Sequence, residues 1–99
     1  MFLGFFDLEA TLKAHLQLKN GNAPATADAA PTFRIYAGAS STPVATGTCS
    51  AVVDSQTGLH LLTQAVTAAN GFARGAYTVR IAYAVSTVAK AQEYSFQVV

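Results

Sequence analysis

Apolar and polar side chains alternate along the last quarter of the chain, as they do in half-buried β-strands. In residues 76–85 every second side chain is large and apolar or aromatic, and the side chains between them are small or polar. Residues 91–99 repeat this alternation. Residues 86–90, between the two segments, are short and polar enough to connect them. The pattern therefore predicts a hairpin of two long strands.

Three further segments have the composition of strands, and turn-forming residues separate them. Residues 32–37 lie between Pro31 and Gly38, and both residue types are common at strand ends. Residues 44–53 and 58–66 predict two more strands, which a four-residue turn would join. With the hairpin, these segments bring the number of predicted strands to five.

Two segments are predicted to be connections. Residues 67–75 contain two glycines and an asparagine, so we expect one helical turn that ends at Asn70-Gly71, where a positive φ is easily adopted. Residues 20–31 are rich in alanine, asparagine, aspartate and proline and form a loop of about a dozen residues. A loop of this length indicates either a mobile segment or one that a partner orders.

Residues 7–19 fit two templates. As a helix, the segment would be capped by Asp7 and would carry a leucine stripe that leaves Leu18 outside it. As a strand, every position from 12 to 19 alternates, and one face carries Leu12, Ala14, Leu16 and Leu18. The strand accounts for more of the positions, and we predict it. Six or seven short strands then indicate an all-β fold, a single antiparallel β-sandwich.

Charge and cysteine content narrow the classes of function. Only 11% of the 99 residues are charged and the net charge is +1, whereas nucleic-acid binding needs a dense basic face, so we expect no nucleic-acid partner. No apolar run reaches the roughly 18 residues of a membrane helix, and we expect no membrane partner. A single cysteine, Cys49, permits neither an internal disulfide nor a cysteine zinc cluster. So few charges on a small domain indicate that a partner covers part of its surface.

The side chains that carry chemistry are few and scattered. Cys49 can be combined on paper with a histidine and Asp54, but a lone cysteine among small and β-branched residues is more typical of a core position. His15 and His60 lie in strand segments, where we expect them on polar faces, and they lack the spacing of metal ligands. We therefore expect no enzyme, no catalytic residue, no metal, no cofactor and no small-molecule substrate.

The N-terminus carries four large apolar side chains outside the strand pattern, namely Phe2, Leu3, Phe5 and Phe6. No basic leader precedes them and Asp7 follows at once, so we expect no secretion signal. We describe residues 1–7 as an apolar arm and residues 8–99 as the β-sandwich domain. Two explanations stay open for the arm: it covers an edge of its own sandwich, or it docks on a neighbouring subunit. We take the four side chains as the candidate interface and expect the arm to be mobile in the isolated protein.

Six motifs follow one another along the domain. In chain order they are Leu8-Glu9-Ala10, Ala30-Pro31-Thr32-Phe33-Arg34-Ile35-Tyr36, Val44-Ala45-Thr46-Gly47-Thr48, Thr57-Gly58-Leu59-His60, Ala68-Ala69-Asn70-Gly71-Phe72-Ala73-Arg74-Gly75-Ala76-Tyr77-Thr78-Val79 and Tyr94-Ser95-Phe96-Gln97-Val98. Together they resemble a family of small virion proteins of tailed bacteriophages. The fifth motif is the most specific, because it is similar to the family's Ala-Asn-Gly-Phe-x-x-Gly-x-Tyr-x-Val segment. His60 departs from the tyrosine that is usual at its position.

The resemblance implies an immunoglobulin-like β-sandwich and a structural role in the virion. It implies first a capsid decoration, or cement, protein that binds the outer capsid lattice and stabilises the head. Its partners would be the major capsid protein, copies of itself, or both, and it would lie on the capsid surface after assembly in the host cytoplasm. The alternative is a tail or baseplate module involved in host attachment. A hydrolytic or carbohydrate-binding module is disfavoured, because the chain offers no assembled triad and no tryptophan.

Overall fold

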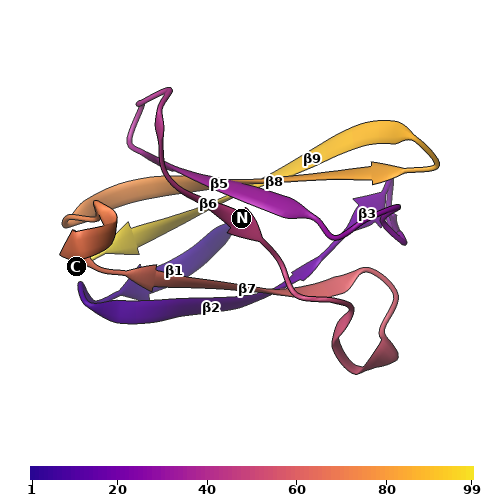
Figure 1. The fold of residues 1–99 in the computed structure, drawn as a ribbon, viewed down its shortest axis with the longest axis horizontal. Helices are drawn as coiled ribbons and strands as arrows, with labels where there is room; N and C mark the ends of the chain where they lie inside the picture. The colour runs from indigo at the N-terminus through magenta and orange to yellow at the C-terminus, as the bar shows by residue number, and fades with distance from the viewer.

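Strands make up most of the chain (Figure 1). The computed structural model describes residues 1–99 and contains no α-helix. Two single 3-10 turns are present, η1 (Val53–Ser55) and η2 (Ala68–Asn70). The strands are β1 (Phe2–Phe6), β2 (Ala10–Gln17), β3 (Lys19–Asn20), β4 (Ala23–Pro24), β5 (Thr32–Ala37), β6 (Pro43–Thr48), β7 (Leu59–Val66), β8 (Gly75–Val85) and β9 (Val88–Val98). The prediction of an all-β fold is confirmed.

The strands form two main sheets. Five of them pair in the order β1-β9-β8-β5-β6, and β2 pairs with β7 in a second sheet. The pairing of β1 with β9 is parallel, and the other pairings in the two sheets are antiparallel. The two-residue strands β3 and β4 pair only with each other. In Figure 1 the β2–β7 layer lies opposite the layer that contains β5, β8 and β9.

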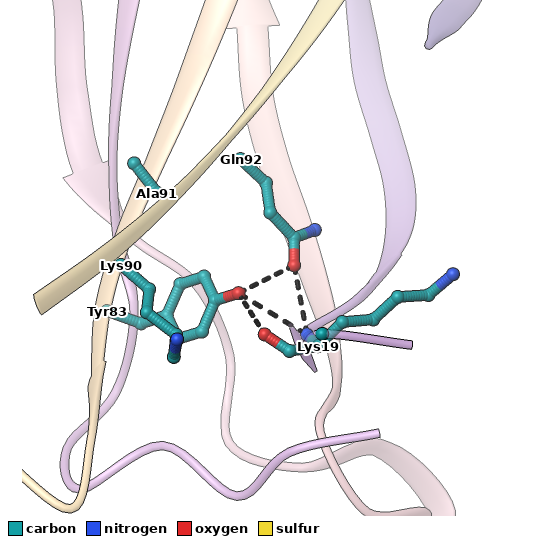
Figure 2. Close-up of a pocket in the computed structure, with 6 residues that line it drawn as sticks. Lys19, Tyr83, Lys90, Ala91 and Gln92 are labelled. Carbon is teal, nitrogen blue, oxygen red and sulfur yellow. Dashed lines mark hydrogen bonds between the residues drawn. The ribbon is translucent and has the colours of Figure 1, made fainter. Parts of the chain in front are cut away.

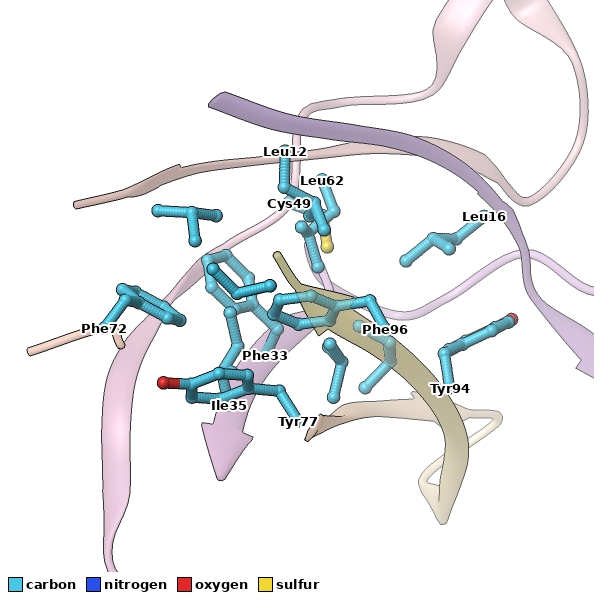
Figure 3. Close-up of a cluster of buried hydrophobic side chains, with 14 of the residues drawn as sticks. Leu12, Leu16, Phe33, Ile35, Cys49, Leu62, Phe72, Tyr77, Tyr94 and Phe96 are labelled. Carbon is cyan, nitrogen blue, oxygen red and sulfur yellow. The ribbon is translucent and has the colours of Figure 1, made fainter. Parts of the chain in front are cut away.

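Apolar and polar side chains alternate along the strands, and the apolar side chains of both sheets lie in the space between the sheets (Figure 3). Leu12, Leu16 and Leu62 enter from the β2–β7 sheet and face side chains of the five-stranded sheet. The rings of Tyr77 and Phe96 stack at the centre, with centroids 5.3 Å apart. The buried side chains of this core are Leu12, Leu16, Leu18, Phe33, Ile35, Cys49, Leu62, Val66, Phe72, Tyr77, Val79, Ile81, Tyr83, Tyr94, Phe96 and Val98.

The turn of the β8–β9 hairpin is shorter than the five-residue connection that the sequence predicts. Val85 pairs with Val88, so Ser86 and Thr87 alone form the turn. Both have a positive φ, of 50° and 68°, as in a type I′ turn, although neither residue is a glycine or an asparagine. The Asp28 carboxylate accepts hydrogen bonds from both turn N–H groups, at 3.0 and 2.7 Å. A residue from a distant segment therefore stabilises this turn.

The predicted strand over residues 44–53 is wrong in its second half. Strand β6 ends at Thr48, because the chain there crosses from one sheet to the other. The N–H of Cys49 still donates to Pro31 beside the five-stranded sheet, at 2.9 Å. The N–H of Ser50 donates to Leu61 of β7, also at 2.9 Å.

Two other expectations for single segments are confirmed. Residues 7–19 contain strand β2 and no helix, so the strand template was the right one. Residues 67–75 contain the expected helical turn, η2, which ends at Gly71 with a φ of 90°. The loop over residues 20–31 holds one further element, the short β4, which pairs back on β3.

Tyr77, in strand β8, forms hydrogen bonds with the backbone of the connection after η2. Its hydroxyl accepts a hydrogen bond from the N–H of Ala73 and donates one to the carbonyl oxygen of Ala73, both at 2.9 Å. The Tyr77 side chain is buried, and its ring also lies against that of Phe72, with centroids 5.2 Å apart. These contacts fix the corner at which the chain passes from β7 of one sheet to β8 of the other.

Candidate interaction surface

The N-terminal residues form a strand of the main sheet. Strand β1 pairs in parallel with β9, with Ser95 donating to Met1 at 2.8 Å and Val99 donating to Phe6 at 2.9 Å. The expectation that these residues lie outside the strand pattern is therefore wrong, and their mobility in the isolated protein stays a prediction. Strand β1 forms one edge of the five-stranded sheet, next to β9.

A β-bulge decides which way the side chains of β1 point. Phe2 pairs with Ser95 and Phe5 with Gln97, so three steps on β1 match two steps on β9. Gly4 lies at the extra position with a φ of 122°, a conformation that glycine adopts at little cost. A regular strand would place Phe2 and Phe5 on opposite faces, whereas the bulge places them on the same face.

The four candidate interface residues divide into an inner and an outer pair. Leu3 and Phe6 are partly buried and pack against the core, and the ring of Phe6 meets that of Phe96 edge-on at 5.9 Å. Phe2 and Phe5 are 52% and 65% exposed, and their rings contact each other edge-to-face at 5.2 Å. The inner pair covers the edge of its own domain, and the outer pair remains available to a partner. We call Phe2 and Phe5 the β1 apolar pair.

The candidate nucleophile is a buried thiol without a base. Cys49 lies in the core, its sulfur makes no hydrogen bond, and burial raises the pKa of the thiol from 9.0 to about 11. No hydrogen bond joins it to His60 or Asp54, and Asp54 lies in the exposed turn η1. The thiol is therefore protonated at neutral pH, and no hydrogen bond links the residues that could have formed a nucleophilic site.

The prediction that His60 lies on a polar strand face is wrong. His60 is 4% exposed and lies on the inner face of β7, the face that also carries Leu62 and Val66. Its Nδ1 lies 2.8 Å from the carbonyl oxygen of Ser50, and because a carbonyl only accepts, Nδ1 carries the proton. Its Nε2 has no hydrogen-bond partner. The alternation of β7 already contained this signal, whereas His15 is exposed as expected.

A polar depression of about 460 Å³ lies at the end of the domain that carries β3 (Figure 2). The Tyr83 hydroxyl lies 2.6 Å from the carbonyl oxygen of Lys19 and 2.7 Å from Oε1 of Gln92, and Gln92 also accepts from the N–H of Lys19 at 2.9 Å. Nε2 of Gln92 donates to the carbonyl oxygen of Gln17. These polar atoms bind one another and so hold β9, β8 and the end of β2 together, which indicates a structural role.

The sequence could not have revealed this network, because its members lie far apart in the chain. Lys19 and Gln92 are separated by 73 residues and meet only in the folded domain. No group of three or more histidine, cysteine, aspartate or glutamate side chains lies close enough to hold a metal ion. No helix is long and apolar enough to cross a membrane.

Comparisons with known proteins return no relative. No protein-family model, no curated protein sequence and no solved structure matches this chain.

Proposed function

We propose that the two sheets form an immunoglobulin-like sandwich. The order β9-β8-β5-β6 corresponds to strands G-F-C-C′ of immunoglobulin domains, and β2 with β7 corresponds to B with E of the facing sheet. Tyr77 supports the same assignment, because a tyrosine near the start of strand F that bonds back to the preceding corner is a hallmark of these domains. No strand lies between β6 and β7, and the chain has neither tryptophan nor a disulfide, so the likeness is to the wider group rather than to antibody domains.

We propose that this domain is a structural protein of a tailed bacteriophage virion, a capsid decoration protein. The observation that carries the proposal is the β1 apolar pair, which lies on an edge strand with more than half of each residue exposed. The six motifs that resemble the virion family and the low content of charged residues support it further. In this function each copy binds neighbouring capsid subunits through that edge and acts by binding alone, without a chemical reaction.

The exposed area of the pair sets the scale of the binding energy. Full burial of one large apolar side chain contributes roughly 1.5–3 kcal/mol. Since Phe2 and Phe5 are 52% and 65% exposed, covering both contributes about 2–3.5 kcal/mol in all, or roughly thirty- to several-hundredfold in affinity. A ligand that binds only the assembled lattice stabilises that lattice by mass action, so many weak copies together protect the head.

The test uses heads of the phage that encodes this chain, produced without its gene. Purified protein is added over a concentration series, and the bound fraction is measured by co-sedimentation. We expect the double variant Phe2→Ser/Phe5→Ser to stay folded, because Leu3 and Phe6 still anchor β1, and to bind the heads at least about tenfold more weakly. The matched control is Val52→Ser/Val88→Ser, which removes two exposed apolar side chains elsewhere and should bind normally. Equal binding of both double variants would contradict the proposed role of the β1 apolar pair.

A further inference from the structure

Two arginines lie directly opposite each other on the outer face of the five-stranded sheet, the face turned away from β2 and β7. Arg34 of β5 pairs with Arg80 of β8 in the antiparallel register. Directly opposed residues of antiparallel strands point to the same face with Cβ atoms roughly 5 Å apart, and like charges there destabilise the sheet. The neighbouring outward positions of the two strands carry uncharged residues, namely Thr32, Tyr36, Thr78 and Ala82.

The protein neutralises only part of this charge. Arg80 approaches Glu93 of β9 with Nη1 and Oε2 3.4 Å apart, and this is the only salt bridge in the chain. Both side chains are at least half exposed, so the contact is weak. Arg34 makes no ion pair and no side-chain hydrogen bond. Arg34, Arg80 and Glu93, which lie side by side across three strands, therefore combine two guanidinium groups with one carboxylate. One positive charge remains in surplus.

The arginines border a depression with further free donors. It has a volume of about 310 Å³ and is lined by Thr32, Arg34, Tyr36, Arg80 and Ala82. Neither the Thr32 nor the Tyr36 hydroxyl is hydrogen-bonded within the protein, and the small Ala82 leaves the space open. A guanidinium group matches a carboxylate through two parallel hydrogen bonds. The depression thus combines one surplus positive charge with hydroxyl donors.

We propose that this depression is a docking site for a protein partner that presents an aspartate or glutamate side chain. The carboxylate is held by Arg34 and Arg80 and neutralises the surplus charge. A second copy of this chain fits less well, because its own outer face would bring another surplus positive charge. The site lies on the same face as the β1 apolar pair, since Phe2 pairs with the outward Ser95. One partner can therefore contact both, but the binding of a carboxylate does not depend on the capsid role.

The first experiment is an NMR titration of the arginine Nε–H resonances in the purified protein. The probes are a capped Gly-Glu-Glu-Gly peptide, its Gly-Gln-Gln-Gly counterpart and inorganic phosphate. We expect saturable shifts at Arg34 and Arg80 with the glutamate peptide and none with the glutamine peptide. Arg34→Thr should weaken the binding about fivefold or more, whereas Arg74→Thr, in the exposed connection after η2, should not.

The second measurement separates a binding site from a structural arginine. Because Arg34 opposes a like charge, Arg34→Thr should raise the melting temperature by roughly 1–6 °C at low salt, and this gain should shrink in about 1 M salt. A lower melting temperature would show that Arg34 stabilises the fold and would overturn the proposal. Tighter binding of phosphate than of the glutamate peptide, or self-association that requires Glu93, would also overturn it, in favour of a phosphate ligand or a second copy.

Discussion

Replacing Tyr77 by phenylalanine removes one oxygen atom from the corner before β8. The aromatic ring is 5% exposed and stacks on Phe96, and phenylalanine preserves that packing. The hydroxyl accepts from the N–H of Ala73 and donates to its carbonyl oxygen, so its loss leaves two backbone groups without these partners. Each such hydrogen bond contributes about 0.5–1.5 kcal/mol. Since Ala73 is itself exposed and water can replace part of the loss, we expect Tyr77→Phe to lower the free energy of unfolding by about 1–2 kcal/mol.

Urea denaturation followed by circular dichroism measures this change. The matched control is Tyr36→Phe, which removes a hydroxyl that makes no hydrogen bond within the protein and should change the stability by less than about 0.5 kcal/mol. Both variants should keep the wild-type dependence of unfolding free energy on urea concentration. If Tyr77→Phe and Tyr36→Phe were equally stable, Tyr77 would not hold the corner, and the strongest local support for the immunoglobulin-like assignment would be lost.

Three further changes test other parts of the structure. Gly4→Ala should destabilise the domain by about 1–2 kcal/mol in the same urea assay, because Gly4 has a φ of 122° that an L side chain rarely adopts; an unchanged midpoint would argue against the bulge. Gln92→Ala should cost about 1–3 kcal/mol, because Tyr83 and the backbone of Lys19 lose a partner; a fully stable variant would show that the network is dispensable. Burial raises the pKa of Cys49 to about 11 and also raises that of Tyr94, so the folded state holds protons that the unfolded state releases and stability should fall as the pH rises from 9 to 11. Cys49→Ala should lessen that fall, and rapid reaction of the native thiol with a disulfide reagent at pH 8 would contradict its burial.

The strands with regular alternation were predictable from sequence, because their apolar side chains recur at every second position and need no knowledge of the rest of the fold. Strand β1 was missed because Gly4 interrupts that alternation with a bulge. An isolated glycine among large apolar residues is itself a bulge signal, and applying it would have recovered the strand. The sequence thus located the four apolar side chains, but only the backbone path separates the exposed β1 apolar pair from Leu3 and Phe6.

Other features depend on contacts between distant segments. The two-residue turn at Ser86-Thr87 lacks the usual residues for its geometry and is stabilised by Asp28, which is 58 residues away. The opposition of Arg34 and Arg80 follows from the register of β5 against β8, and nothing local to either strand specifies that register. Hydrophobic periodicity therefore predicted which residues form most strands, whereas tertiary pairing determined the polar sites.

The proposed function requires that a tailed bacteriophage encode this chain, and the copy number of the chain in purified virions of that phage tests the proposal most directly. Quantitative mass spectrometry against the major capsid protein measures it, and a map of the particle by electron cryomicroscopy locates the chain. A decoration protein follows the symmetry of the capsid lattice, so we expect on the order of hundreds of copies, with density on the outer surface of the head. A small fixed number of copies with density at the tail or baseplate, or the absence of the chain from the virion, would contradict the proposed function.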